Sequence, residues 1–298
     1  MRVLVTGGAG FIGSHLAHAL VEAGHDVVVL DNLRRGRRAA VPIAAEFIEG
    51  DIRHPDTVLT ATSGCEVVFH LAAQSNVMGA MDDVDYSFTS NVAGTLNVLH
   101  AAAECGVRRV VFASSREAYG EPEQLPVSED APLVARNLYG ASKIAAEAYC
   151  EAWRGTAGLD TVVLRFANVY GPGDSGRVIP LWLARAVRGE DLELYGGAQV
   201  LDFVHVDVAV KALIAAMKPG VQGPINVGSG QGTALRDLAA RILALTGARS
   251  RLVLRPPRGP EVVRFVADVR RMRTVLGIEP PADSLAGLDA MVDDLVHS

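Results

Sequence analysis

Short apolar runs alternate with longer segments in which apolar residues recur at helical spacing over the first 170 residues. The apolar runs predict strands at 2–6, 26–30, 67–71, 109–114 and 161–166. The helical pattern predicts helices at 13–23, 92–105 and 142–153. Because the predicted strands are apolar throughout, both faces of their sheet must be covered by helices, as in a parallel sheet. The pattern therefore predicts a doubly wound α/β fold, whose ligands bind at the carboxyl ends of the strands.

The pattern changes after residue 170, where Gly171-Pro172-Gly173 opens a loop. We expect a helix at 181–187, a strand at 202–206, a helix at 208–217 and a short strand at 225–227. The proline-rich segment 255–260 must be extended or turning. We therefore expect a dinucleotide-binding part at 1–170, with sheet elements that return near 202–228. A smaller, interleaved substrate lobe would occupy 171–298.

The first predicted strand runs into a glycine-rich turn that reads VLVTGGAGFIG at 3–13. Gly8, Gly10 and Gly13 match the dinucleotide fingerprint, and its required context, a strand before and a helix after, is present. Glycines let the backbone approach a pyrophosphate closely, and a helix start offers free N–H groups and a positive dipole end. The turn predicts a Rossmann-type dinucleotide site that includes Gly7, Gly10, Phe11, Ile12 and Gly13.

Asp31 ends the second predicted strand, 18 residues after Gly13. A carboxylate there accepts hydrogen bonds from a ribose 2′-hydroxyl and repels a 2′-phosphate, so Asp31 and the adjacent Asn32 favour NAD over NADP. The arginine run at 34–38 is the counter-argument, because it could bind that phosphate, although we expect a solvated loop. Asp51 and Ile52 follow another apolar run and are expected at the adenine edge, with a turn aspartate as the alternative for Asp51.

Tyr139 and Lys143 lie one turn apart at the start of a predicted helix and so share one face. A phenol ionises near pKa 10, and a neighbouring ammonium lowers that pKa toward the range in which a tyrosine acts as a base. The strand at 109–114 ends at Ser114 and Ser115, which supply hydroxyls at the same sheet edge. This combination after a dinucleotide fingerprint predicts an oxidoreductase-type site.

Several segments together resemble one known family: TGGAGFIG at 6–13, HLAAQ at 70–74, SSREAYG at 114–120, YGASK at 139–143 and RFANVYGPG at 165–173. The segments at 202–207 and 255–261 continue the match, which covers nearly the whole chain. The sequence is similar to the extended short-chain dehydrogenase/reductases, in the group of NAD-dependent nucleotide-sugar epimerases and dehydratases such as the UDP-glucose 4-epimerases.

The resemblance implies a role for each matching residue. Tyr139 would be the general base, Lys143 its partner and a ligand of the nicotinamide ribose, and Ser115 the hydroxyl that binds the reacting sugar oxygen. Leu71, Ala72 and Ala73 would line the cofactor. The substrate residues implied are Asn168 and Arg258 for the phosphates, with Gln74, Val178, Tyr195 and Gln199 as weaker candidates.

Two positions depart from the family pattern. Leu201 stands where many relatives carry an arginine, so one phosphate contact is in doubt. Arg116 and Glu117 stand where the sugar 4,6-dehydratases carry Asp-Glu, so only the glutamate matches.

These departures leave the reaction after sugar oxidation open. Return of the hydride to the other face of a 4-keto sugar makes a 4-epimerase, which we favour. If Glu117 abstracts the C5 proton, the enzyme is a dehydratase; with a uronic acid held by Arg116 it is a decarboxylase. Glu117 as a structural carboxylate paired with Arg116 is the plain alternative. A noncatalytic NAD-binding protein is the remote one.

Composition limits the partners. The net charge of −6 gives no support to nucleic-acid binding, and no apolar run reaches the roughly 20 residues that a membrane helix needs. The N-terminus lacks the pattern of a signal peptide. Cys65, Cys105 and Cys150 lack metal-ligand spacing and suggest reduced thiols in the cytoplasm, with no metal expected.

The helices predicted at 92–105 and 142–153 are apolar on more than one side. We expect one side to pack on the sheet and the other to form a homodimer interface, as in the relatives, with isologous contacts. The candidate interface residues are Leu96, Leu99, Ala145 and Tyr149. Burial beneath the C-terminal lobe is the alternative.

Overall fold

The structure is a computed structural model that describes residues 1–259 and 261–297, with side chains described up to residue 293. Pro260, within the segment predicted to be extended at 255–260, lies outside the described residues. Residues 256–259 have the irregular backbone expected for their prolines.

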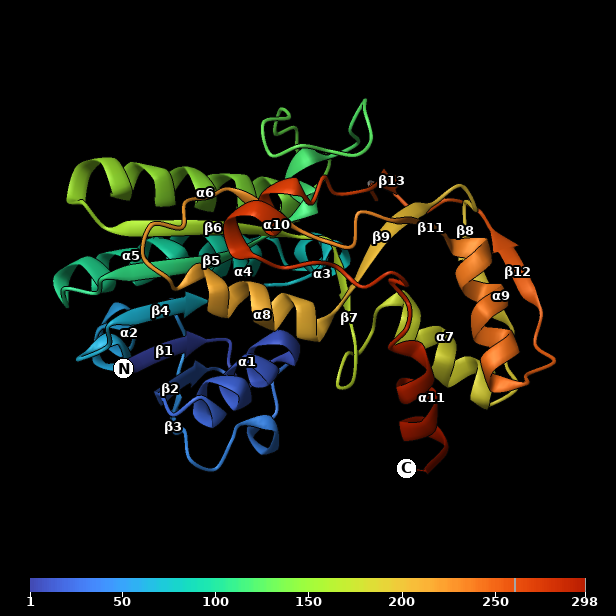
Figure 1. The fold of residues 1–298 in the computed structure, drawn as a ribbon, viewed down its shortest axis with the longest axis horizontal. Coiled ribbons are helices and arrows are strands. Elements are labelled where there is room, and N and C mark those ends of the chain that lie inside the picture. Colours follow the sequence, from blue (N-terminus) through green and yellow to red (C-terminus); the bar gives the residue numbers. More distant parts are fainter. Residues whose placement is uncertain (260, 298) are drawn as a thin grey trace.

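The main sheet of the described chain has seven strands, and all its strand pairs are parallel (Figure 1). Their spatial order is β3 (Glu46–Glu49), β2 (Asp26–Asp31), β1 (Arg2–Thr6), β4 (Val67–His70), β5 (Arg109–Ser115), β6 (Asp160–Phe166) and β10 (Ile225–Val227). The order reverses beside β1, and ligands of such sheets bind outside the carboxyl ends of the strands at that point. The predicted doubly wound fold is confirmed.

Successive strand residues face two separate cores, which explains why the strands are apolar throughout. Val3 and Val5 pack with one set of helices and Leu4 with the other, and all three are fully buried. The first core is covered by α1 (Phe11–Glu22), α8 (Val206–Ala216) and α10 (Arg270–Leu276). The second core is covered by α2 (Pro55–Thr62), α5 (Gly94–Glu104) and α6 (Leu138–Ala157).

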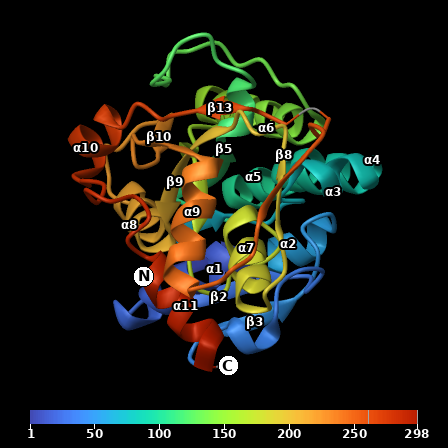
Figure 2. The same ribbon diagram turned by 90° about the vertical axis from the view of Figure 1, so that its right-hand side faces the viewer.

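A smaller lobe with its own core follows β6 (Figure 2). Its strands are β7 (Asn168–Tyr170), β9 (Val200–His205), β11 (Gly232–Ala234) and β13 (Arg264–Phe265) in one sheet, and β8 (Leu192–Tyr195) and β12 (Leu252–Arg255) in another. Its helices are α7 (Val178–Val187), α9 (Leu235–Thr246) and α11 (Leu288–His297). Since α8 and β10 return to the main sheet between β9 and β11, the two parts are interleaved. A domain boundary at residue 170 stays a prediction.

The sequence prediction missed several elements of the first lobe: β3, α2, α3 (Val77–Asp82), α4 (Val84–Phe88), α10, the π-helical turn η2 (Thr89–Ala93) and the 3₁₀ turns η1 (Arg38–Ala40) and η3 (Arg116–Tyr119). In the smaller lobe it missed β7, β8, β11, β12, β13, α9 and α11. The edge strand β3 has exposed glutamates at both ends, so it shows no continuous apolar run. Helix α6 begins earlier than predicted, at Leu138, which places Tyr139 in its first turn.

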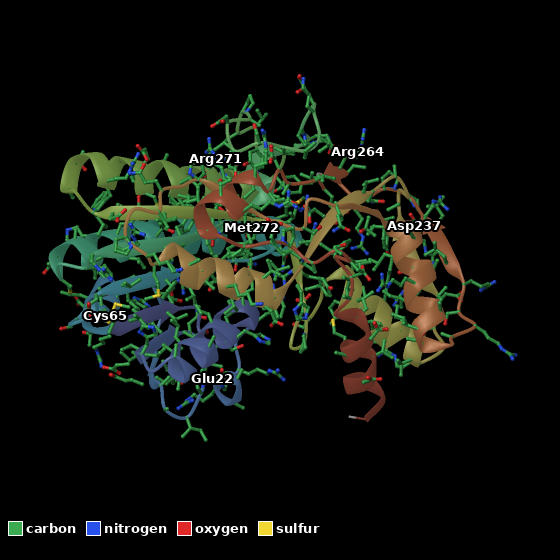
Figure 3. The ribbon with its side chains drawn as sticks, in the orientation of Figure 1. Glu22, Cys65, Asp237, Arg264, Arg271 and Met272 are labelled. Atoms are coloured by element: carbon green, nitrogen blue, oxygen red, sulfur yellow. The ribbon has the colours of Figure 1, made fainter. Side chains whose placement is uncertain are left out.

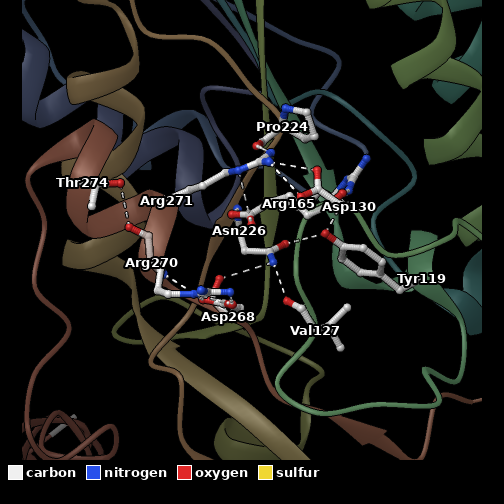
Figure 4. A network of polar contacts seen from close by, with 11 residues as sticks. Tyr119, Val127, Asp130, Arg165, Pro224, Asn226, Asp268, Arg270, Arg271 and Thr274 are labelled. Carbon is white, nitrogen blue, oxygen red and sulfur yellow. Dashed lines mark hydrogen bonds and ion pairs between the residues drawn. The ribbon is translucent and has the colours of Figure 1, made fainter.

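A buried polar network holds the returning C-terminal segment against the main sheet (Figure 4). Asn226 on β10 accepts a hydrogen bond from the Tyr119 hydroxyl (2.7 Å) and donates one to the Val127 carbonyl (2.8 Å). Arg165 on β6 donates to the same Tyr119 oxygen (2.9 Å). Arg271 on α10 pairs with Asp130 at 2.8 Å. The loop after η3 and the edge of the sheet are therefore joined by buried side chains that are costly to leave unpaired, and an exposed ion pair connects α10 to the same loop.

The three cysteines are free thiols; Cys65 and Cys150 are buried, and Cys65 lies within the first lobe, at the left of the view in Figure 3. No cluster of three or more potential metal ligands occurs among the described residues. Within the same residues, every helix is too short or too polar to cross a bilayer.

Candidate active site

A single large cavity of about 1140 Å³ lies at the carboxyl ends of the main strands and extends into the smaller lobe. Every residue that the sequence predicted for catalysis or substrate binding lines it: Gln74, Ser115, Arg116, Glu117, Tyr139, Lys143, Asn168, Val178, Tyr195, Gln199 and Arg258. So do the predicted cofactor residues apart from Asp51: Gly7, Gly10, Phe11, Ile12, Gly13, Asp31, Asn32, Ile52, Leu71, Ala72 and Ala73. The fold thus joins segments from both ends of the chain in one site.

The glycine turn before α1 is shaped to receive an anion. Gly7 has a left-handed φ of +73°, and a Cβ on Gly13 would lie 2.1 Å from the Gly7 carbonyl oxygen, so only glycine fits at both positions. Gly10 caps α1, and among the described side chains none accepts a hydrogen bond from the first turn. The first turn also contains no acidic residue. Its N–H groups therefore face the cavity and suit a pyrophosphate.

Asp31 stands beside this turn at the end of β2. Its two carboxylate oxygens accept hydrogen bonds from the backbone N–H of Leu33 (2.8 Å) and of Ala9 (3.0 Å). Burial raises the pKa of Asp31, and these two hydrogen bonds oppose the rise. The carboxylate is thereby fixed in orientation and keeps lone pairs for a ribose hydroxyl.

The arginine run was predicted to be a solvated loop, and this is only partly right. Arg34, Arg35 and Arg37 are exposed, but they also line the cavity. Arg34 stacks on the Tyr86 ring, 3.8 Å from its centre, and pairs with Asp83 at 3.0 Å. Sequence periodicity could not show that this loop folds over the glycine turn.

Asp51 lies between two cavity residues, Gly50 and Ile52, but is not itself part of the lining. Its carboxylate accepts hydrogen bonds from Asn32 (2.9 Å) and from Arg53. Burial alone would raise the pKa of Asp51, yet the hydrogen bonds from Arg53 hold it below its ordinary value. A contact of Asp51 with an adenine stays a prediction.

The predicted catalytic pair, Tyr139 and Lys143, lies in the first two turns of α6. Lys143 is buried, its Nζ donates to the Ala113 carbonyl (2.8 Å), and it lies 5.8 Å from the centre of the Tyr139 ring. Desolvation lowers the pKa of Lys143 to about 8, against the opposing charge of Glu147. The ammonium therefore titrates near neutrality.

Tyr139 is hydrogen bonded to Ser115, the last residue of β5. Its pKa is raised, because burial disfavours the phenolate more than the Ser115 hydrogen bond and the charge of Arg177 favour it. The expectation that Lys143, together with a nicotinamide cation, favours the phenolate stays a prediction. Additional positive charge is needed beside the ring.

Arg116 and Glu117, in η3, are already engaged with their neighbours. The two side chains form an ion pair at 3.0 Å, and each is about nine-tenths buried (11% and 8% exposed). Arg116 also donates from Nε to the Asn168 side-chain oxygen (3.3 Å), and Glu117 accepts from Asn137 (2.8 Å).

The smaller lobe supplies the rest of the cavity. Asn168 on β7 donates to the Asp202 carbonyl (3.0 Å), and the Arg258 guanidinium stacks on the Tyr195 ring. Gln199 donates to the Tyr195 carbonyl. Leu201 is buried in the core of this lobe and presents an apolar surface to the cavity.

Sequence analysis did not identify two arginines that line the cavity, Arg177 and Arg185. Arg177 pairs with Asp174 at 2.7 Å and lies over the Phe11 ring, so the loop at 171–177 reaches the start of α1. Arg185 on α7 pairs with Glu193 at 3.3 Å. No spacing distinguishes these residues from surface arginines; only their position after the RFANVYGPG segment could have drawn attention to them.

Known proteins are similar to this chain over its whole length. The model of the NAD dependent epimerase/dehydratase family matches residues 3–228. The UDP-glucose 4-epimerase of Mycolicibacterium smegmatis is 38% identical over 307 residues, covering 98% of each chain. The Thermotoga maritima UDP-glucose 4-epimerase with UDP-glucose superposes with a TM-score of 0.97 at 34% identity, covering 100% of this chain and 99% of that one.

The Thermus thermophilus UDP-glucose 4-epimerase in complex with NAD superposes with a TM-score of 0.94, at 34% identity and with 100% of both chains covered. A match of this extent, together with the glycine turn, Ser115, Tyr139 and Lys143 in one cavity, leaves one assignment. The chain belongs to the NAD-dependent epimerase/dehydratase family.

Proposed function

We propose that this protein is an NAD-dependent nucleotide-sugar 4-epimerase whose substrate is a UDP-linked hexose. The observation that carries the proposal is the meeting of Ser115, Tyr139 and Lys143 in a cavity that has an anion-binding turn in one lobe and Arg258 in the other. The similarity to UDP-glucose 4-epimerases over the full chain supports the choice of sugar nucleotide.

NAD fits the first lobe. The free N–H groups of α1 would hold its pyrophosphate, and Asp31 would accept a ribose hydroxyl. When bound, NAD supplies a hydride acceptor and a positive ring near Tyr139. Lys143 would hold the ribose next to that ring by its ammonium.

Proton transfer is the task of Tyr139. The phenolate takes the proton of the sugar 4-hydroxyl as the C4 hydrogen leaves as hydride, and Ser115 orients the reacting oxygen through its own hydrogen bond to Tyr139. A 4-keto sugar results. Return of the hydride to the opposite face, with Tyr139 giving the proton back, yields the epimer, and no further acid or base is needed.

The second candidate reaction is lyase chemistry, and the reason to weigh it is that Glu117 lines the cavity. Its carboxylate would have to abstract the C5 proton, yet one oxygen pairs with Arg116 and the other accepts from Asn137. Those two contacts engage both carboxylate oxygens and fix the direction of the side chain, which supports epimerisation over loss of water or carbon dioxide. A noncatalytic role is disfavoured by the complete set of Ser115, Tyr139 and Lys143.

The substrate diphosphate would lie between the lobes, with Arg258 as the bidentate cation and Asn168 as an amide ligand. Gln74, Val178, Tyr195 and Gln199 line the same cavity and would shape the sugar and base subsites. Leu201 adds no charge there, so Arg258 carries a larger share of phosphate binding.

We also propose a homodimer formed by the outer faces of α5 and α6. Tyr149 is 38% exposed, and Leu96 and Ala145 are half-buried, which leaves apolar surface for a partner. The prediction for Leu99 is wrong, because that side chain is fully buried beneath α5. The free thiols are typical of a reducing compartment and support a cytoplasmic location.

The test is incubation of the purified protein with UDP-glucose, UDP-galactose, UDP-glucuronate and their N-acetyl relatives, followed by mass spectrometry and NMR. The expected product has the same mass and the opposite C4 configuration. Loss of 18 or 44 mass units, for water or carbon dioxide, would instead identify a lyase. Absence of any product with every sugar nucleotide would refute the proposal.

A further inference from the structure

Glu117 lines the cavity two residues after Ser115, and protein groups contact both of its carboxylate oxygens. Oε1 pairs with Arg116 at 3.0 Å, and Oε2 accepts a hydrogen bond from Asn137 Nδ2 at 2.8 Å. The side chain is 8% exposed. Charge-assisted hydrogen bonds in such a buried setting are short and directional. Both carboxylate oxygens are thus bound by other side chains of the protein.

Asn137 is the residue that starts the catalytic helix. Its Oδ1 accepts a hydrogen bond from the Gly140 N–H (2.8 Å) as the N-cap of α6, in extended backbone geometry. The side-chain amide of Asn137 therefore accepts a hydrogen bond from the helix through its oxygen and donates one to Glu117 through its nitrogen. Neither end can turn without losing one of these contacts, so Glu117 contributes to the orientation of the cap.

The main chain of Glu117 makes a second connection to the same helix turn. A Cβ on Gly140 would lie 2.4 Å from the Glu117 carbonyl oxygen, so η3 and the first turn of α6 are in direct backbone contact. Glu117 N also donates to Ser115 Oγ at 3.2 Å. One residue therefore contacts both the serine that binds the reacting oxygen and the helix turn that carries Tyr139.

We propose that Glu117 is a positioning residue: held by Arg116, it fixes Asn137 and thereby the place of Tyr139 relative to Ser115. This inference rests on the proposed epimerase function. Its physical basis is that proton transfer needs the donor and acceptor within hydrogen-bond reach, and that a displacement of 1 Å reduces the rate by about 100-fold.

Three variants separate positioning from chemistry. Glu117→Ala removes the contact to Asn137, and we expect kcat to fall about 10- to 100-fold with little change in KM. Glu117→Gln keeps an acceptor for Asn137 and should recover most of that loss. Asn137→Ser keeps a helix cap but has no side-chain nitrogen to donate, so it should reproduce the kcat loss of Glu117→Ala.

Combining Glu117→Ala with Asn137→Ser should cost less than the product of the two separate losses, because the contact between these two residues is broken in both variants. Glu22→Gln, an exposed carboxylate at the end of α1, is the matched control (Figure 3). The pH profile gives a further readout. The negative charge of Glu117 raises the pKa of Tyr139, so Glu117→Gln should shift the acid limb to lower pH.

Hydrogen exchange of the peptide at 137–145 tests positioning without catalysis. Glu117→Ala and Asn137→Ser should speed exchange of the Gly140 and Ala141 amides, whereas Glu117→Gln should change it little. The proposal is overturned if kcat falls as far in Glu117→Gln as in Glu117→Ala while Asn137→Ser keeps the wild-type kcat. If the wild type acts on no nucleotide sugar, the proposed function fails. In that case hydrogen exchange alone tests the inference. Unchanged protection of the Gly140 and Ala141 amides in both Glu117→Ala and Asn137→Ser refutes it.

Discussion

The guanidinium carbon of Arg258 lies 3.5 Å from the centre of the Tyr195 ring, in the part of the cavity built by the smaller lobe. Stacking on an aromatic face holds the plane of an arginine and leaves its N–H edge free for two oxyanions. The ring therefore orients the one cation that we assign to the substrate diphosphate.

Arg258→Ala should weaken substrate binding without changing the chemical step. A hydrogen bond to a charged group contributes about 1.5–3 kcal/mol, which corresponds to a roughly 10- to 100-fold rise in KM. Arg258→Lys should recover little, because an ammonium neither stacks nor binds two oxygens. Steady-state kinetics and calorimetry with UDP check this. A fall in kcat at constant KM would contradict the assignment.

Tyr139→Phe removes one hydroxyl and should lower kcat by about 10²- to 10⁴-fold, the usual contribution of a general base. Bound NAD should be retained, since the glycine turn and Asp31 are untouched. Tyr149→Phe, on the exposed face of the same helix, is the control. Retention of more than a tenth of the wild-type kcat in Tyr139→Phe would exclude this tyrosine as the base.

Burial of Lys143 makes the stability of the fold depend on pH. The pKa of Lys143 falls from 10.5 to about 8 on folding, so between pH 8 and 10.5 the unfolded chain binds the proton more tightly than the folded protein. Stability then rises with pH across that window, and below pH 8 the full desolvation penalty applies.

Lys143→Met removes this titration. Without NAD, the wild type should gain unfolding free energy between pH 7 and 10 and the variant should not. The unfolding free energy of the variant minus that of the wild type should therefore decrease by an amount on the order of a few kcal/mol. Urea unfolding at several pH values measures it. A difference that stays constant with pH would show that the lysine is not desolvated in the folded protein.

The ion pair between Arg165 and Glu147 is buried on both sides, at 2.7 Å, behind Lys143. Glu147→Gln leaves a buried guanidinium without its anion, which should destabilise the protein by about 3–5 kcal/mol. Glu151→Gln, in an exposed pair with Arg154 on the same helix, should cost under about 1 kcal/mol. Equal losses in the two variants, measured by urea unfolding, would contradict the burial argument.

Apolar periodicity was enough to predict the central strands, because each is buried on both faces, and the covering helices α1, α5, α6 and α8, but not α2 or α10. Ser115, Tyr139 and Lys143 were found from spacing within single elements and from the resemblance, and the structure brings them together.

The sequence could not predict contacts between residues that are far apart along the chain. Glu117 and Asn137 are 20 residues apart, and no periodicity links a 3₁₀ turn to the cap of a later helix. The same holds for Arg177, which reaches Phe11 from the other lobe. The apolar pattern of α5 also could not tell that Leu99 faces inward while Tyr149 on α6 faces outward.

The interleaving of the lobes has a consequence for biosynthesis. Strand β10 and helices α8 and α10, which complete the first core, are translated after the smaller lobe has begun. A nascent chain that ends near residue 170 would therefore expose the β6 edge and the apolar face that α8 later covers, features that favour aggregation. The first lobe can reach its native form only once the ribosome has passed residue 276, so a premature stop anywhere before that point should yield insoluble protein.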